Sequence, residues 1–196
     1  MTQPAGEQRA AAIRDFRDRL GQSVTELAAK TPVHLFIMGP APDADSQGAR
    51  LRKELVGRAK ADGYSAFAEH PEIKDAVGSA LGDEVDLCTV ELNFAARVDL
   101  LVFIPCSPGS FAELGYFAAL ASRGKKKPLG PKSIVLVDHS FKDSKNFVLD
   151  GPVQLMREAK ANVNYVDYGD AEAAWGILTA AISAERRRKV REQVTG

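Results

Sequence analysis

Long apolar runs are scarce in this chain of 196 residues. The first stretch, Met1 to Gly21, is polar and charged and contains no apolar core of the kind that a secretion signal has. No apolar run in the sequence approaches the roughly 18 residues that a membrane-spanning helix needs. We therefore expect a cytoplasmic protein that makes no contact with a membrane.

Cysteine is rare and the net charge is zero. The only cysteines are Cys88 and Cys106, and neither has the spacing of a metal-ligand motif. We expect both to be free thiols, with no bound metal. Lysine plus arginine equals aspartate plus glutamate at 26 each. This balance argues against nucleic acid or an anionic membrane as a partner.

Three signatures of common nucleotide enzymes and hydrolases are also missing. No Gly-x-Gly-x-x-Gly fingerprint follows the first apolar run, which argues against a dehydrogenase. No phosphate loop ending in Gly-Lys-Ser/Thr occurs, and no serine lies in a Gly-x-Ser-x-Gly turn. We expect neither a P-loop ATPase nor a serine hydrolase of the triad type, and no resident cofactor.

The sequence does contain apolar runs that alternate with helical periodicity. These runs predict parallel strands at residues 33–38, 64–68, 98–104, 133–137 and 163–166. Helical spacing predicts helices at residues 7–29, 48–62, 83–96, 111–123 and 170–193. The order predicts an α/β fold, Rossmann-like or flavodoxin-like, with a mostly parallel five-stranded sheet flanked by helices. We expect one domain over residues 1–196, with a flexible tail at residues 1–6.

Ligands of open parallel sheets bind beyond the carboxyl ends of the strands. Gly39-Pro40 ends the first predicted strand, and Glu69 and His70 follow the second. Glu69 could bind a sugar hydroxyl or could be a plain loop residue. The third strand leads into the turn Cys106 to Ser110. These segments form our candidate binding site.

The turn after the third strand, Ser107-Pro-Gly-Ser-Phe-Ala-Glu113, has the most specific pattern in the chain. Gly109 allows a ligand to approach the backbone closely. Ser110 is suited to be the N-cap of the next helix. The free N–H groups of the first helical turn would then bind an anion or a phosphate.

Glu113 has two interpretations. Ser110 and Glu113 together match the Ser-x-x-Glu capping box, in which the carboxylate only caps the helix. Alternatively, Glu113 is a carboxylate that attacks the anomeric carbon of a sugar or stabilises its oxocarbenium-like transition state.

Two further residues are candidates on the basis of their helical neighbours. The residues three and four positions from Glu91 are all apolar, so Glu91 should point to the interior. It is either a structural carboxylate or a proton donor to a leaving base. Tyr116 lies one turn after Glu113 and either orients that carboxylate through its hydroxyl or packs in the core.

These segments resemble the nucleoside 2-deoxyribosyltransferase-like superfamily. The resemblance rests on Phe36-Ile-Met-Gly-Pro40, on the strand at 98–104 and on the turn Ser107 to Tyr116. It implies that Glu113 is the glycosyl-accepting nucleophile, that Ser110 replaces the family's threonine, and that the protein is at least a dimer. The subgroup most similar to this chain is the effectors of bacterial retron antiphage systems, which also carry glutamates like Glu91 and Glu69.

Ser107 departs from the transferase pattern, in which an aspartate six residues before the nucleophile handles the leaving base. The retron subgroup implies hydrolysis of a nucleotide, or of the nicotinamide bond of NAD, in preference to base exchange on free nucleosides. The sequence therefore predicts an N-glycosidase or transferase with catalytic Glu113 and Glu91. The binding residues would be Gly39, Pro40, Glu69, Ser107, Gly109, Ser110 and Tyr116. A non-catalytic nucleotide-binding domain of the same fold is the alternative.

Overall fold

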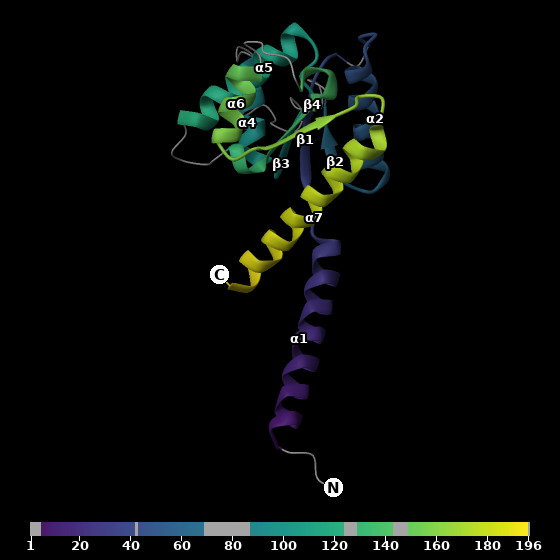
Figure 1. Ribbon diagram of the computed structural model, residues 1–196, viewed down its shortest axis with the longest axis vertical. Coiled ribbons are helices and arrows are strands. Elements are labelled where there is room, and N and C mark those ends of the chain that lie inside the picture. The colour runs from purple at the N-terminus through teal and green to yellow at the C-terminus, as the bar shows by residue number, and fades with distance from the viewer. Residues whose placement is uncertain (1–4, 42, 69–86, 124–128, 143–148, 196) are drawn as a thin grey trace. The chain divides into compact units, whose positions relative to one another are not determined.

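The computed structural model describes residues 5–41, 43–68, 87–123, 129–142 and 149–195 (Figure 1). The chain falls into two compact units, which we describe separately. The larger unit is residues 33–179, and the smaller unit joins residues 1–32 to residues 180–196. The organisation of residues 1–196 as a single domain stays a prediction.

The larger unit is built on a parallel sheet of five strands in the order β2-β1-β3-β4-β5. Its strands are β1 (His34–Met38), β2 (Ser65–Phe67), β3 (Leu100–Phe103), β4 (Ser133–Asp138) and β5 (Asn162–Val166). Every neighbouring pair is parallel, and Met38 of β1 lies beside Phe103 of β3 in the register. The predicted fold class is therefore confirmed, and the strand order is the flavodoxin-like one.

Helices cover both faces of this sheet. Figure 1 shows α4 (Leu87–Arg97), α5 (Pro108–Arg123) and α6 (Gln154–Glu158) on one side, with α2 (Gln47–Ala61) on the other. The first turns of α7 (Ala171–Thr195) lie beside α2, since Arg58 pairs with Glu172 at 2.5 Å. The remaining short helical segments are Gly130–Lys132, His139–Phe141 and Leu149–Val153.

The core explains why the central strands read as continuous apolar runs. Strand side chains alternate between the two faces, and both faces are covered. On the α4–α5 side, Phe36 of β1 meets Phe94 of α4 edge to face at 5.2 Å. Phe103 of β3 meets Phe117 of α5 in the same way at 5.4 Å. These two contacts fix α4 and α5 on the sheet.

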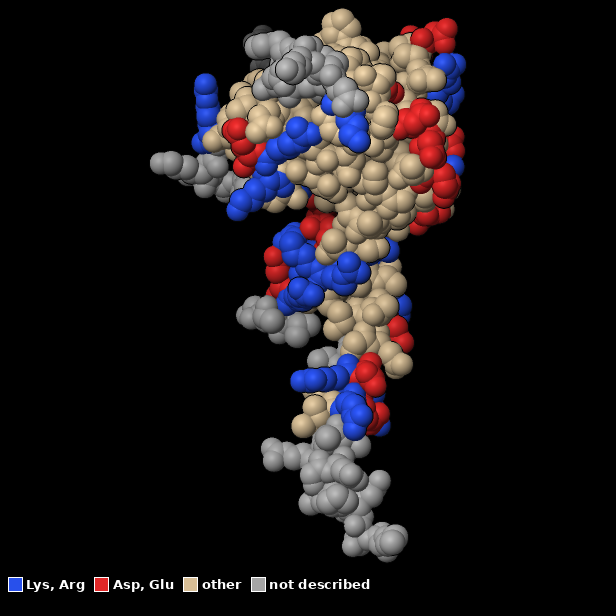
Figure 2. Space-filling view, in the orientation of Figure 1, with Lys and Arg blue, Asp and Glu red and all other residues tan. Residues whose placement is uncertain are grey.

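The smaller unit consists of α1 (Ala5–Lys30) and the last turns of α7. Arg186 donates to the Thr31 carbonyl at 3.0 Å and Lys189 to the Pro32 carbonyl at 2.8 Å. Arg188 pairs with both Glu185 and Glu192 at 2.5 Å. Basic and acidic side chains accordingly lie next to one another along the end of α7 (Figure 2).

The elements differ from the predicted ones mainly at their ends. Helix α1 begins at Ala5, so two residues that we assigned to the tail are helical, and residues 1–4 lie outside the described part. The predicted stop of α2 at Asp62-Gly63 is confirmed, because Gly63 takes the positive φ of 79° that ends many helices. In the described residues, no helix is both long and apolar enough to cross a membrane.

Candidate functional site

The strand order reverses at one place on the carboxyl edge of the sheet. After β1 the chain crosses to β2 on one side, and the later strands extend from β3 on the other side. Ligands of such sheets bind where the order reverses, beyond the ends of β1 and β3. Gly39-Pro40 follows β1 and Pro105-Cys106-Ser107 follows β3. The structure thus brings together two of the predicted binding segments, Gly39-Pro40 and the turn after β3.

The turn after β3 is organised by two serines. Helix α5 begins at Pro108, one turn earlier than the predicted start at Phe111. The Ser110 N–H donates to the Ser107 hydroxyl at 3.2 Å, and the Ser107 N–H donates to the Ser110 hydroxyl at 2.9 Å. This is the reciprocal pattern of a capping box, with Ser107 as the cap. The predicted cap at Ser110 is therefore wrong.

This correction changes the meaning of Glu113. With Ser107 as the cap, Glu113 lies in the second turn of α5, beyond the reach of a capping carboxylate. The capping interpretation of Glu113 is wrong, because Ser110 fills the place that we gave to it. The Glu113 carboxylate is therefore available for a role other than capping the helix.

The N–H groups of the first turn of α5, which we expected to bind an anion, are partly used in hydrogen bonds within the protein. The Ser110 N–H donates to the Ser107 hydroxyl, and the Phe111 N–H donates to the Ser107 carbonyl at 3.0 Å. Pro108 has no N–H to offer. A Cβ added at Gly109 would meet nothing within 4 Å among the described residues beyond its own helical turn, so this side of Gly109 is open.

Glu113 and Glu91 occupy corresponding places on neighbouring helices. Phe94 lies three residues after Glu91 on α4, and Phe117 lies four residues after Glu113 on α5. Residues at these spacings share a helix face, and both phenylalanines pack on the sheet. Both glutamates therefore lie on the sheet side of their helices, one turn nearer the helix N-terminus.

Glu91 is buried, with 6% of its surface exposed. This confirms the inward orientation that its apolar neighbours predicted. Glu113 is half-buried. The pKa of Glu113 is raised from its ordinary value of 4.5 to about 7, mainly by burial and next by the nearby charge of Glu91, while Arg52 acts in the opposite direction. The site thus contains two carboxylates that repel each other and one guanidinium that attracts Glu113.

Arg52, which the sequence analysis missed, is 8% exposed on α2. Its Nε donates to the Ile37 carbonyl at 3.2 Å, its Nη1 donates to the Pro40 carbonyl at 2.7 Å, and its Nη2 donates to the Ala68 carbonyl. Arg52 thus connects the ends of β1 and β2. The apolar residues of α2 at matching spacing, Leu55 and Ala59, were the signal that this arginine faces the interior.

Gly39 lies where the loop after β1 meets the end of β3. An added Cβ would lie 3.2 Å from both the Cβ and the carbonyl oxygen of Ile104 and 3.4 Å from Cδ of Arg52. Glycine therefore lets the loop after β1 pack against the end of β3. The adjacent Pro40 is buried and contributes its carbonyl to Arg52.

Two of the predicted site residues, Tyr116 and Glu69, do not join this group in the described structure. Tyr116 is 39% exposed and meets the ring of Phe117, so its placement in the core is wrong. Within the described part of the chain, no hydrogen bond joins Tyr116 to Glu113. Glu69 and His70 lie outside the described residues. The described residues also contain no group of three His, Cys, Asp or Glu side chains able to bind a metal.

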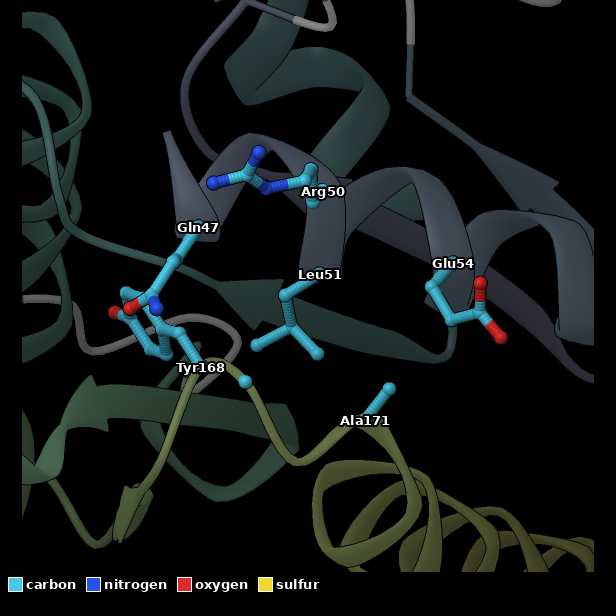
Figure 3. A pocket seen from close by; sticks show the side chains of 7 residues that line it. Gln47, Arg50, Leu51, Glu54, Tyr168 and Ala171 are labelled. Atoms are coloured by element: carbon cyan, nitrogen blue, oxygen red, sulfur yellow. The ribbon is translucent and has the colours of Figure 1, made fainter. Parts of the chain in front are cut away.

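A separate hollow of about 340 Å³ lies between α2 and the turn that leads into α7 (Figure 3). It is lined by Gln47, Arg50, Leu51, Glu54, Tyr168, Gly169 and Ala171. Tyr168 is buried and donates its hydroxyl to the Leu136 carbonyl at 2.7 Å. None of the predicted site residues lines this hollow.

Glu113→Gln should make the protein more stable at about pH 8 and leave its stability unchanged at about pH 4. The raised pKa means that the folded state disfavours the ionised carboxylate, so the wild type loses stability as the pH rises from about 4.5 to about 7. Water screens a half-buried charge, so we expect a gain of about 1–2 kcal/mol, or about 4 °C in Tm. Thermal unfolding at the two pH values checks this, and an equal or lower Tm of the variant at about pH 8 would contradict it.

The fold and site define a flavodoxin-like α/β protein with an acidic pair at its switch point. Residues 49–194 match the family described as STM3845 retron effector protein. The chain therefore belongs to this family, as the resemblance implied.

A protein of Escherichia coli described as "Retron Ec86 putative ribosyltransferase/DNA-binding protein" is similar over part of the chain. It is 38% identical over 72 residues, which is 37% of this chain and 22% of that protein. The match thus spans about a fifth of the length of this relative.

Proposed function

We propose that this retron effector cleaves the N-glycosidic bond of a nucleoside, a nucleotide or NAD, with Glu113 as the catalytic carboxylate. The observation that carries the proposal is the placement of Glu113 at the switch point, half-buried, with its pKa raised to about 7 beside Glu91. Pairs of carboxylates with perturbed pKa values are typical of enzymes that act on glycosidic bonds. The name of the E. coli relative, which includes ribosyltransferase, supports the same chemistry.

In the proposed reaction, the bond between C1′ of the sugar and the nitrogen of the base breaks, and its electron pair leaves with the base. Positive charge develops at C1′ in the transition state. The ionised Glu113 either attacks C1′ to form a glycosyl ester or stabilises that charge. Attack by water then yields the free sugar, and the proton that water releases balances the reaction. Attack by another base would make the enzyme a transferase.

Glu91 is proposed to protonate the leaving base. A buried carboxyl group can serve as a general acid when it lies next to the reacting atoms. Gly39, Pro40, Ser107, Gly109, Ser110 and Tyr116, together with Glu69, remain the proposed binding residues. The open backbone of Gly109 favours the approach of a phosphate or sugar group there.

Incubation with a panel of nucleosides, nucleotides and NAD tests the proposal, with free base measured by chromatography. We expect base or nicotinamide to be released from at least one compound. A non-catalytic nucleotide-binding domain is the alternative. Recovery of every compound intact after long incubation, together with tight binding of one of them, would favour that alternative.

We also propose that the protein is cytoplasmic and at least a dimer. Helix α1 favours association, because Ile13, Phe16 and Leu27 are 46%, 66% and 44% exposed. The equal numbers of basic and acidic residues, 26 each, argue against DNA as a partner of this chain. Light scattering of the purified chain tests the oligomer, and a mass of 21.1 kDa would contradict it.

A further inference from the structure

Tyr168 is a buried tyrosine at the carboxyl edge of the sheet that the proposed reaction does not use. It lies on the turn between β5 and α7 (Figure 3) and is 4% exposed. Its hydroxyl donates to the Leu136 carbonyl at 2.7 Å and to the Pro105 carbonyl at 3.2 Å. A phenol has a single O–H proton, so the two carbonyls share it. Tyr168 therefore connects the end of β3 to β4 through one group.

The Tyr168 hydroxyl lies where the pairing of β3 with β4 ends. The register of the two strands ends at Phe103 and Val135, and Pro105 and Leu136 lie just beyond it. Both residues are buried. A buried carbonyl that loses its partner costs about 1–3 kcal/mol. Without the hydroxyl, the Pro105 carbonyl would therefore have to move to reach water.

The next residue along the chain, Cys106, packs against the first turn of α2. A Cβ added at Gly48 would lie 2.2 Å from Sγ of Cys106 and 3.3 Å from Cε2 of Tyr168. Two such atoms cannot approach to 2.2 Å, so glycine is what allows α2 to contact both residues. The hydroxyl of Ser46, the N-cap of α2, lies 4.0 Å from the same sulfur. Helix α2 thus holds the residue that follows Pro105.

These contacts reach the turn that carries proposed binding residues. The N–H groups of Cys106 and Ser107 both donate to the Ser110 hydroxyl, at 3.0 and 2.9 Å. Pro105, Cys106 and Ser107 are consecutive, so a displacement of Pro105 also displaces the two amides that organise the start of α5. The position of the turn therefore depends on residues outside it.

We propose that Tyr168 and Gly48 are positioning residues, which hold the turn after β3 where Ser107, Gly109 and Ser110 bind the substrate. This role rests on the proposed function. Tyr168 acts through the Pro105 carbonyl, and Gly48 acts by leaving room for the Cys106 side chain. Loss of either should change the binding of substrate as well as the stability of the fold.

Tyr168→Phe keeps the ring and removes only the hydroxyl. The Cys106 and Ser107 amides should then exchange hydrogen at least about fivefold faster, because their bonds to Ser110 open more often. The amides of β1 give the global stability against which this is measured. KM for base release should rise at least about fivefold with kcat within about twofold, since binding residues move while Phe117 still packs α5 on the sheet.

The test combines hydrogen exchange of the full chain, followed by ¹⁵N NMR, with the kinetics of base release. The kinetics use the nucleoside, nucleotide or NAD from which the wild type releases base. Hydrogen exchange needs no turnover, so it distinguishes an error about the turn from an error about the reaction. Tyr165→Phe is the matched control, because the Tyr165 hydroxyl on β5 accepts a hydrogen bond from Arg157 at 3.0 Å instead. This control should leave both measurements unchanged.

Exchange of the Cys106 and Ser107 amides at the wild-type rate in Tyr168→Phe would overturn the proposal. Faster exchange with an unchanged KM would also overturn it, because the hydroxyl would then serve stability alone. If Tyr168→Phe does not fold, as judged by circular dichroism, Gly48→Ala decides by the same two measurements. Absence of base release in the wild type, with faster exchange in Tyr168→Phe, would instead overturn the proposed function and leave the contact of Tyr168 with the turn in place.

Discussion

Glu113→Gln is expected to lower the rate of base release by at least about a thousandfold. Glutamine has nearly the same size and shape as glutamate, so the variant should keep the packing of α5 on the sheet. It cannot carry the negative charge that attacks C1′ or balances the positive charge of the transition state. The initial rate of base release, measured by chromatography with saturating substrate, gives the effect on kcat.

Glu158→Gln is the matched control. Glu158 is an exposed glutamate on α6 that accepts a hydrogen bond from Gln154 at 3.2 Å, and the same substitution there should leave the rate within about twofold of the wild type. Because Glu113→Gln should also be at least as stable as the wild type, unfolding cannot explain a loss of its activity. A rate for Glu113→Gln within tenfold of the wild type would show that this carboxylate is not the catalytic group.

The sheet could be predicted from the sequence because its central strands are buried on both faces. Runs such as residues 33–38 and 98–104 have no polar alternation, which a parallel strand covered by two layers of helices explains. Glu91 could be predicted for a similar reason. Its neighbours at three and four positions are apolar, and only one helix face can be buried against the sheet.

The start of α5 could not be chosen from the pattern alone. Ser107 and Ser110 are both good caps, and each is followed at the third position by a residue that completes a capping box, Ser110 in one case and Glu113 in the other. Proline favours the first turn of a helix, and Pro108 therefore fits a start after Ser107. Pro108 is thus the residue that distinguishes the two possible helix starts.

Arg52 was missed because long charged side chains are usually found on the surface. Its burial depends on three carbonyl groups from β1, the loop after it and the end of β2, which only tertiary structure brings together. The same limit applies to the raised pKa of Glu113. That shift arises from burial and from Glu91, a residue on a different helix, so no local sequence pattern contains it.

The pH dependence of base release by the wild type tests most directly whether the ionised Glu113 performs the chemistry. With a pKa of about 7 for Glu113, kcat/KM should fall about tenfold for each pH unit below 7. The direction follows from the mechanism, because only the deprotonated carboxylate can attack or stabilise C1′. A profile that is flat between about pH 5 and 8, or that falls as the pH rises through 7, would contradict the account.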